Sequence, residues 1–514
     1  MAVKVPENLR ELIELYQEER ADQTCIFWRD EEVTYRQLNE RANRVANGLK
    51  ALGVKKGDVV SVYLPNCPDY YYVWFGILKL GAVFGPINAM FKGDEVRHVL
   101  SDSGAVALIT AEALLDTINA IRGDCPALRD VICLEGERPR ATAYAKLMEH
   151  SEELGPVEIA RDDLAAIVYT SGTTGKPKGA MISHWNAVWD TMAASDAVPM
   201  SPGEGRLGLI LPLFHANAQI TSLTQFYTGG AVAMWERFSP SDFWETVDRY
   251  HPKSFSAVPT MLSILLMAPV KEGLDISSLE FVICGAAPLP VDIFERFEEA
   301  FNLRISEGYG LTEGTCVSSL NPFWGVRKVG SIGLPLRGQP MKIVDDDMNE
   351  LPPGEYGEIV VKGHNVMQGY YNNPEATAET IVNGWLRTGD MGYMDEDGYF
   401  FIVDRKKDMI IRGGENIYPR EIEEVLFTHP QIAEATVIGR PDPIWGEETV
   451  ALVVLAPGAA LTAEEVQEFC KQRLADYKVP REVRFREALP KTLTGKVQKK
   501  LLKEELFGGG GESR

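Results

Sequence analysis

The sequence predicts an α/β protein with a large N-terminal domain of mainly parallel sheets flanked by helices, a β-rich subdomain, and a small mobile α/β C-terminal domain. Three observations predict this fold class. Short apolar runs typical of buried strands alternate with helical patterns through residues 1–284. Short strands between Pro/Gly turns replace this alternation near residue 330. A charged junction at 404–407 then precedes a second α/β unit, and 514 residues suffice for two or more domains.

A helix is predicted at residues 35–52. Apolar residues recur at helical spacing within it, the pair Thr34 and Gln37 has capping-box spacing, and Gly53 follows its last turn. Buried strands are predicted around this helix and further along the chain, at 58–64, 105–110, 130–134 and 164–169.

The same alternation continues beyond residue 200. We expect strands at 206–211, 231–235, 254–258, 279–284 and 303–306, and helices at 218–227 and 241–250. The C-terminal unit should contain helices at 419–427 and 462–474. The predicted domains are residues 1–404, with the β-rich subdomain at about 330–400, and residues 405–507, followed by a disordered glycine-rich tail at 508–514.

The stretch 169–179, YTSGTTGKPKG, is the centre of the predicted site. After the apolar strand that ends at Tyr169, it contains three glycines, four serine or threonine hydroxyls and two lysines. Glycines allow backbone N–H groups to face a ligand, hydroxyls add neutral donors, and lysines balance the charge of a polyphosphate. The pattern differs from a Walker A loop because Pro177 follows Lys176 and no glycine stands at the required offset. We therefore predict a phosphate-binding loop, with a solvated Gly/Thr turn as the alternative.

A second stretch, 307–313, has the sequence EGYGLTE. Tyr309 offers a flat face for a base, and Thr312 offers a hydroxyl. A carboxylate such as Glu313 is compatible with a phosphate site when a cation such as Mg²⁺ lies between them. The alternative is a strand–helix turn in which Glu313 is an acid favoured by the helix dipole.

Three further residues are open to two interpretations each. Asp390 ends the stretch WLRTGD at an expected turn, where it can accept hydrogen bonds from a ribose or form an Asx-turn. His215 follows a buried strand and is either part of a ligand pocket or a core histidine. Lys496 stands beside Gly495 in a basic strip at 471–503, where it is either catalytic or a surface lysine.

Composition limits the possible partners. The net charge of −22 argues against nucleic acid or an anionic membrane surface, although the basic strip holds 11 basic and 3 acidic residues. The seven cysteines are scattered without a C-x-x-C pair, so we expect most to be small core residues. The start of the chain has no signal-type apolar block and no apolar run reaches a membrane span, which predicts a cytoplasmic protein.

Taken together, five motifs resemble those of the AMP-forming adenylating superfamily, which includes acyl-CoA synthetases, luciferases and the adenylation domains of peptide synthetases. They occur in the family's order: YTSGTTGKPKG, GYGLTE, WLRTGD, DRKKDMIIRGGENIYPREIE and PKTLTGK. The resemblance covers nearly the whole chain. Within the superfamily, RGGEN and FHANAQ are most similar to bacterial acyl-CoA ligases, including the crotonobetaine/carnitine–CoA ligase group.

The resemblance implies a role for each matched residue. ATP would be bound by Thr170, Ser171, Gly172, Thr173, Thr174, Gly175, Lys178, Gly285, Ala286, Ala287, Tyr309, Gly310, Thr312, Asp390, Arg405 and Lys496. Catalysis would involve Lys496, Thr312, Glu313 and His215, with Glu313 holding Mg²⁺. His215, Asn217 and Gly310 would line the acyl pocket, Lys407 would be the hinge, and Arg412, Gly413, Gly414 and Trp445 would bind coenzyme A.

The implied reaction joins a carboxylic acid to AMP, releases diphosphate, and passes the acyl group to coenzyme A after the C-terminal domain rotates. Asn217 and Gln219 favour small or medium acids over very long chains. An adenylating enzyme with an amine, carrier-protein thiol or oxygen as acceptor is the first alternative, and a non-catalytic nucleotide- or acyl-binding protein is the second. We expect a monomer or homodimer.

Overall fold

The computed structural model describes residues 5–170, 177–413, 415–491 and 497–507. Two large sheets form the N-terminal part, and in each the central strands run parallel, as predicted. The first sheet has nine strands in the order β16 (Leu334–Pro335), β15 (Ser319–Leu320), β14 (Arg304–Tyr309), β13 (Phe281–Cys284), β12 (Ser254–Ala257), β10 (Arg206–Leu209), β11 (Ala231–Met234), β1 (Thr24–Trp28) and β2 (Glu31–Thr34). Its strands from β14 to β1 pair in parallel.

The second large sheet has eight strands. Their order is β19 (Gly369–Tyr370), β9 (Lys178–Ser183), β8 (Leu164–Thr170), β4 (Val83–Pro86), β3 (Val59–Tyr63), β5 (Ala107–Thr110), β6 (Asp130–Cys133) and β7 (Thr142–Ala143). Strands β8 to β7 pair in parallel, whereas β8 and β9 form an antiparallel pair.

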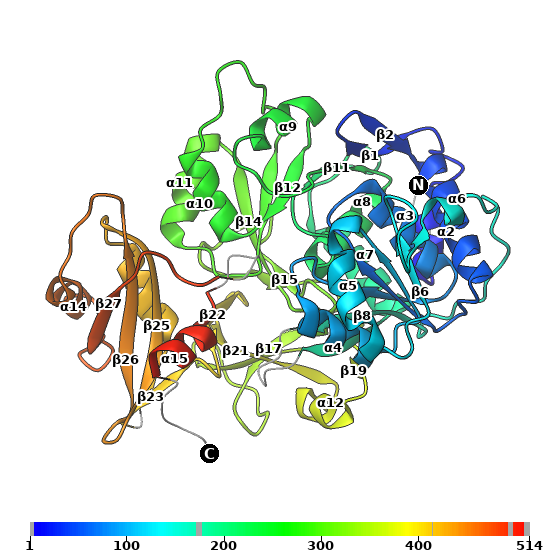
Figure 1. The fold of residues 1–514 in the computed structure, drawn as a ribbon. Helices are drawn as coiled ribbons and strands as arrows, with labels where there is room; N and C mark the ends of the chain where they lie inside the picture. Colours follow the sequence, from blue (N-terminus) through cyan, green and yellow to red (C-terminus); the bar gives the residue numbers. More distant parts are fainter. Residues whose placement is uncertain (1–4, 171–176, 414, 492–496, 508–514) are drawn as a thin grey trace.

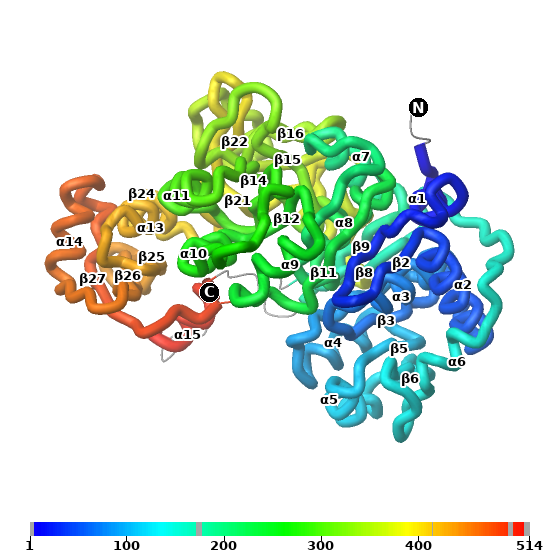
Figure 2. Tube along the Cα trace, turned by 90° about the horizontal axis from the view of Figure 1, so that it is seen from above, coloured from blue at the N-terminus to red at the C-terminus, as the bar shows by residue number. Residues whose placement is uncertain are grey.

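Two smaller sheets follow. The first contains β17 (Met341–Val344), β18 (Gly357–Val361), β21 (Trp385–Met394) and β20 (Ile381–Val382), and β22 (Phe400–Arg405) pairs with β21. The second contains β24 (Glu415–Ile417), β23 (Ile410–Arg412), β26 (Gly446–Leu455) and β25 (Ile432–Asp442), and β27 (Glu482–Phe485) pairs with β26. In Figure 1 the strands β25, β26 and β27 lie at the left, away from the blue and cyan N-terminal elements; Figure 2 shows the same separation from above. The β-rich subdomain and the small C-terminal domain are therefore both present.

Helices cover the sheets. They are α1 (Leu9–Glu14), α2 (Tyr35–Ala51), α3 (Pro68–Lys79), α4 (Gly93–Ser103), α5 (Leu115–Ile121), α6 (Ala145–Met148), α7 (His184–Ala197), α8 (Ala216–Thr228), α9 (Phe243–Tyr250), α10 (Pro259–Met267), α11 (Val291–Phe301), α12 (Pro374–Thr380), α13 (Pro419–Phe427), α14 (Ala463–Lys471) and α15 (Lys499–Phe507), with short 3-10 helices η1 (Glu112–Leu114), η2 (Arg122–Asp124) and η3 (Thr312–Gly314). The predicted capping box of α2 is present, with Gln37 N–H donating to Thr34 Oγ1 and Thr34 N–H donating to Gln37 Oε1.

Helix α3 lies in the interior of the N-terminal part. Its residues from Tyr70 to Lys79 are all buried, and Lys79 is paired with Glu14 at 2.8 Å. A helix that is apolar all round belongs in a large protein core or a membrane, and here it lies in the core that both large sheets share. Over the part of the chain that the structure describes, no helix combines the length and apolar character that a membrane crossing requires.

Candidate functional site

The predicted phosphate-binding loop connects two antiparallel strands. Thr170, the last residue of β8, is opposite Lys178, the first residue of β9, so the pair forms the base of a hairpin. Ser171, Gly172, Thr173, Thr174 and Gly175 lie outside the described residues. The sequence analysis did not predict β9, because its first residues, Lys178 and Gly179, resemble a continuation of the loop.

Helix α4 holds both ends of this hairpin loop. Tyr169 donates from its hydroxyl to Asp102 Oδ2 at 2.6 Å, and His98 Nε2 is 2.8 Å from the carbonyl oxygen of Pro177. The residues on either side of the loop are thus fixed to one helix.

Glu313 lies beside this hairpin. Its Oε1 accepts a hydrogen bond from the Tyr370 hydroxyl at 2.8 Å and one from Thr170 Oγ1 at 3.3 Å. The ammonium group of Lys178 is 5.1 Å from the centre of the Tyr370 ring. Burial, and then Glu313, raise the pKa of Tyr370, so its phenol keeps its proton and donates. We call Thr170, Lys178, Glu313 and Tyr370 the phosphate corner.

The phosphate corner fits a magnesium–polyphosphate complex. Mg²⁺ takes one or two carboxylates together with phosphate oxygens, and Glu313 supplies one carboxylate whose orientation two hydroxyls fix. Lys178 supplies positive charge at the same place. Tyr370 was missed from sequence, since it belongs to a two-residue strand whose position depends on pairing with β9.

A second group of residues lies where β14, β21 and β22 meet. The Tyr309 hydroxyl donates to Asp390 Oδ2 at 2.6 Å, and Arg405 Nε is 2.5 Å from Asp390 Oδ1. Burial, and then Asp390, raise the pKa of Tyr309 well above its ordinary value, so the phenol remains a donor. We call Tyr309, Asp390 and Arg405 the nucleoside corner.

The expected turn at Asp390 is wrong. Asp390 lies inside the long strand β21 and is directly opposite Arg405 of β22. Gly389, at φ +70°, provides the local irregularity that suggested a turn. The carboxylate is therefore held by a sheet, with its side chain 4% exposed.

Gly285 brings the end of β13 against β14. A Cβ atom on Gly285 would lie 2.8 Å from the carbonyl oxygen of Gly308, so a side chain there would collide with backbone. Ala286 has φ +67° and is exposed, and Ala287 follows it. Nearby, Glu307 is buried and its Oε2 has no hydrogen-bond partner among the described residues. Burial raises the pKa of Glu307 to about 7. No role was predicted for Glu307 from the sequence.

The loop between the two corners is tightly folded. A Cβ on Gly310 would lie 1.6 Å from the carbonyl oxygen of Cys316, so only glycine fits. Thr315 has φ +67° and ψ −60°, a backbone conformation that costs about 1–3 kcal/mol for a residue with a side chain. Thr312 and Glu313 lie in the short helix η3 within this loop.

The predicted acyl-pocket residues follow strands of the same sheet. His215 comes after β10 and Gly310 after β14, both at the carboxyl ends of parallel strands, where ligands of such sheets bind. Burial lowers the pKa of His215 to about 4, and its Nε2 has no partner among the described residues. Asn217 Oδ1 accepts from the Ser256 hydroxyl at 2.9 Å. The pocket wall at these residues is uncharged at neutral pH.

Four residues were predicted to bind coenzyme A. Three of them lie together on the C-terminal domain: the Arg412 guanidinium is 4.7 Å from the Trp445 ring centre, and Gly413 N–H donates to the Trp445 carbonyl at 2.8 Å. A Cβ on Gly413 would lie 2.8 Å from Trp445, so glycine permits this contact. Gly414, like Lys496, lies outside the described residues. Strands β23 and β24, which flank Gly413 and Gly414, form an antiparallel pair.

Lys407 lies in the exposed turn between β22 and β23. Asp408 N–H donates to the Arg405 carbonyl at 2.9 Å, which closes the turn. The predicted hinge residue therefore stands between a strand of the β-rich sheet and the first strand of the C-terminal sheet.

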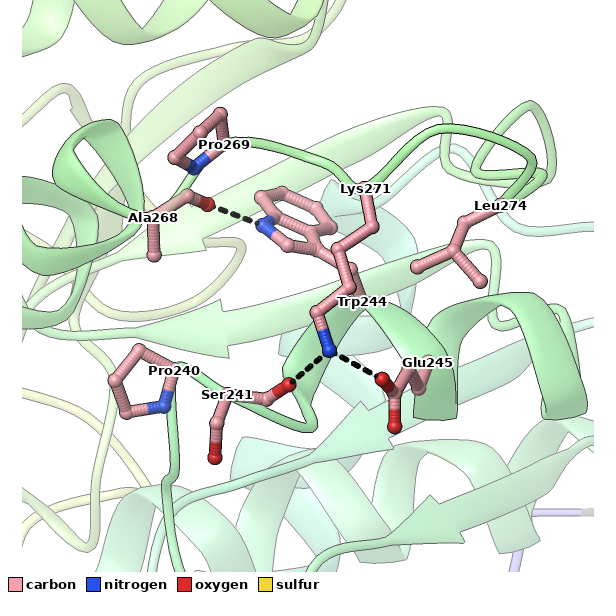
Figure 3. A pocket seen from close by; sticks show the side chains of 8 residues that line it. All are labelled: Pro240, Ser241, Trp244, Glu245, Ala268, Pro269, Lys271 and Leu274. Atoms are coloured by element: carbon pink, nitrogen blue, oxygen red, sulfur yellow. Dashed lines mark hydrogen bonds and ion pairs between the residues drawn. The ribbon is translucent and has the colours of Figure 1, made fainter.

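A separate hollow of about 310 Å³ lies between α9 and the segment after α10 (Figure 3). Trp244 forms its wall, and Lys271 is paired with Glu245 at 2.5 Å. None of the predicted site residues lines this hollow, and its lysine is already neutralised, so it does not compete as a phosphate site.

The two corners and the loop between them bring together the residue types that a nucleotide-dependent enzyme uses. Comparison with known families agrees with this class. Residues 14–371 match the family described as AMP-binding enzyme, and residues 421–496 match the AMP-binding enzyme C-terminal domain. The chain belongs to the AMP-binding enzyme family.

Relatives with curated names are similar over almost the full length. A feruloyl-CoA synthase of Amycolatopsis sp is 39% identical, over 91% of this chain and 92% of the relative. A long-chain-fatty-acid–CoA ligase of Bacillus subtilis (strain 168) is 36% identical, over 94% of this chain and 92% of the relative.

Several solved structures have the same fold over nearly the whole chain. The anthranilate CoA ligase AuaEII in complex with anthranoyl-AMP has a TM-score of 0.91 at 29% identity, covering 98% of both chains. ATP-bound MatB from Rhodopseudomonas palustris has a TM-score of 0.90 at 31% identity and covers 97% of this chain and 99% of its own. Apo MatB from the same organism has a TM-score of 0.79 at 31% identity, with 97% and 98% covered.

Proposed function

We propose that the protein is an ATP-dependent acid–CoA ligase that forms an acyl-adenylate before the thioester. The observation that carries this proposal is the arrangement of the two corners. Tyr309 of the nucleoside corner ends β14, and Glu313 of the phosphate corner lies four residues later in the loop that follows, so a nucleoside and its phosphates can be bound together. The relatives named above are a long-chain-fatty-acid–CoA ligase and a feruloyl-CoA synthase, and their names support coenzyme A as the acceptor.

In the first half-reaction, a carboxylate oxygen attacks the α-phosphorus of ATP. A new P–O bond forms to the acid while the bond to the bridging oxygen breaks, and diphosphate leaves with its electron pair. No base is needed, since the nucleophile is already ionised. The residues therefore act by position and charge: Asp390 and Arg405 hold the ribose, while Thr170, Lys178 and Thr312 hold phosphates.

Mg²⁺, bound by Glu313, would neutralise phosphate charge when present. Lys496 would add a cation between the acid and the α-phosphate, which is worth about 10²–10³-fold in rate. Glu307 is placed to accept a hydrogen bond from the amino group of adenine, because its buried oxygen has no other partner among the described residues.

In the second half-reaction, the thiol of coenzyme A attacks the acyl carbon, the thioester forms, and AMP leaves. We propose that the C-terminal domain, residues 405–507, rotates about Lys407 between the two steps and brings Arg412, Gly413, Gly414 and Trp445 to the thiol. The TM-score to this chain is 0.90 for ATP-bound MatB and 0.79 for apo MatB. This difference supports a rearrangement between the two forms. The arrangement described here resembles the ATP-bound form more closely.

We propose as substrate a mainly apolar carboxylic acid with no charged group besides the reacting carboxylate. Burial keeps His215 neutral at physiological pH, and Asn217 already accepts a hydrogen bond from Ser256, so neither offers a charge to a second acidic group. The relatives named for ferulate and for long-chain fatty acids bracket this class. We propose that the enzyme acts in the cytoplasm, where ATP and coenzyme A are available. We also propose that it is a monomer or a homodimer.

A diphosphate-release assay over a panel of acids tests the proposal. The panel contains fatty acids of several lengths and hydroxycinnamic acids, each with and without coenzyme A. We expect diphosphate with an accepted acid alone, and thioester only when coenzyme A is added. Diphosphate release with an acid but no thioester would favour a different acceptor. Nucleotide binding without any acid-dependent diphosphate release would favour a binding protein.

A further inference from the structure

The loop that carries Thr312 and Glu313 is closed at its base by strand pairing. Tyr309 of β14 is opposite Ser319 of β15, and Ser318 N–H donates to the Tyr309 carbonyl at 2.8 Å. We call residues 310–318 the Glu313 loop. Between its fixed ends the loop contains the strained Thr315, so the position of Glu313 depends on what holds the middle of the loop.

The first support comes from Asn365, which is fully buried. Its Nδ2 donates to the Gly314 carbonyl and to Ser318 Oγ, both at 3.3 Å. Its own backbone carbonyl accepts from the Thr315 hydroxyl at 2.6 Å. Asn365 therefore contacts the loop on both sides of the strained residue.

The second support comes from Asp190 in helix α7, which is also fully buried. Its Oδ2 accepts from the Val317 N–H at 3.1 Å, and its Oδ1 accepts from Gln339 Nε2 at 2.9 Å. Gln339 is fully buried as well, and its Oε1 has no hydrogen-bond partner among the described residues. A buried carboxyl group is thus directed at the backbone of the loop, two residues after Thr315.

Neither residue belongs to the two corners. Asp190 reaches the site only through Val317, and Asn365 only through Gly314, Thr315 and Ser318. Strained backbone persists where its surroundings over-determine it. Buried polar partners that orient a metal ligand typically change metal affinity when they are removed.

We propose that Asp190 and Asn365 are positioning residues that hold the Glu313 loop in the conformation that binds the metal–nucleotide complex. This proposal rests on the proposed role of Glu313. Loss of either support lets Thr315 relax and moves the Glu313 carboxylate away from Thr170 and Tyr370. The consequence is weaker metal binding at an otherwise intact nucleotide site.

The test measures Mn²⁺ binding by electron paramagnetic resonance in the presence of α,β-methylene ATP, so no turnover is involved. Asn365→Ala removes the amide but keeps the backbone contact to Thr315, and Asp190→Leu removes the acceptor for Val317. We expect Mn²⁺ affinity to fall about tenfold in each. The Mg²⁺ concentration for half-maximal diphosphate release should rise by the same factor, with KM for the acid unchanged.

Two matched variants separate positioning from mere stability. Asp190→Asn can accept from Val317 with its oxygen, and when the Gln339 amide turns over it can donate to Gln339 Oε1, so wild-type Mn²⁺ affinity is expected. Asn43→Ala removes another buried asparagine, which lies in α2. Its Nδ2 donates to the Glu152 carbonyl at 2.8 Å. Asn43→Ala should lower the unfolding temperature without changing Mn²⁺ affinity.

Wild-type Mn²⁺ affinity in folded Asn365→Ala and Asp190→Leu would overturn the proposal, as would an equal loss in Asn43→Ala. If Asp190→Leu does not fold, Asn365→Ala decides the question alone. A wild-type protein that binds Mn²⁺ with the nucleotide but releases no diphosphate with any acid would refute the proposed function and leave this inference standing.

Discussion

The phosphate corner and the Arg412–Trp445 face of the C-terminal domain are built in opposite ways. At the phosphate corner, side chains from β8, η3, β19 and β9 converge, and Glu313 is oriented by two hydroxyls. On the C-terminal face, Trp445 is 46% exposed and the adjacent Ile444 is 81% exposed. Arg412 contacts Glu448 and Trp445, and Gly413 contacts Trp445, all within the C-terminal domain. A fixed corner suits charge stabilisation, whereas a self-contained exposed face can move as a unit.

The largest expected effect separates the two half-reactions. Lys496→Ala should reduce adenylation about 10²–10³-fold, because it removes a cation from the developing charge. The same variant should still convert a pre-made acyl-adenylate to thioester. Both rates are measured by single-turnover assays. Lys500→Ala is the control, since Lys500 is exposed and forms an ion pair with Glu504 at 3.8 Å. Equal loss of both half-reactions would contradict the division of labour between the two regions.

The next effect concerns the turn between the regions. Lys407→Pro should leave adenylation intact and slow thioester formation about tenfold or more, which corresponds to about 1.4 kcal/mol, because proline fixes φ where rotation is expected. The neighbouring Lys406→Ala serves as a comparison, although it loses an ion pair with Asp346 at 2.5 Å. A second step as fast as in the wild type would remove Lys407 as the hinge.

A smaller effect is expected on the C-terminal face itself. Trp445→Ala should raise KM for coenzyme A about fivefold, as expected for the loss of about 1 kcal/mol of aromatic contact. Diphosphate release without coenzyme A should not change. Trp324→Ala, at a tryptophan that is 60% exposed elsewhere, is the matched control. If both variants behave alike, the face does not bind coenzyme A.

The smallest effect concerns His215 at the acyl pocket. Burial lowers the pKa of His215 from 6.5 to about 4, so the imidazole is neutral above about pH 4 in the folded protein. The unfolded chain then binds more protons between about pH 4 and 6.5, and the group's contribution to stability is lost as the pH falls through this window. Unfolding of His215→Phe should therefore be less sensitive to acid than that of the wild type. Its adenylation profile between pH 6 and 8 should keep the wild-type shape; a changed shape would mean that His215 titrates there.

The helices and strands that local sequence signals predicted are present in the structure. The helix at 419–427 has the predicted bounds, and the α2 capping box formed because Thr34 and Gln37 are three residues apart along the chain. Five cysteines are buried and two partly so, as expected of small core residues. Such features depend on neighbours in sequence, where spacing is sufficient to predict contact.

Long-range pairing was the part that sequence did not show. Strand β9 and the mid-strand position of Asp390 depend on pairing with other strands, β8 for β9 and β22 for Asp390. Tyr370 reaches Glu313 across 57 positions, and Asp190 reaches Val317 across 127. No motif marks these residues, because their role follows from the folded position of another segment.

The most direct test of the account is a single-turnover experiment with purified protein, magnesium ATP and one accepted acid. Without coenzyme A, we predict that diphosphate and enzyme-bound acyl-adenylate form in equal amounts. Addition of coenzyme A should then release AMP and acyl-CoA in equal amounts. Formation of ADP and phosphate, or diphosphate release that does not depend on the acid, would contradict the account.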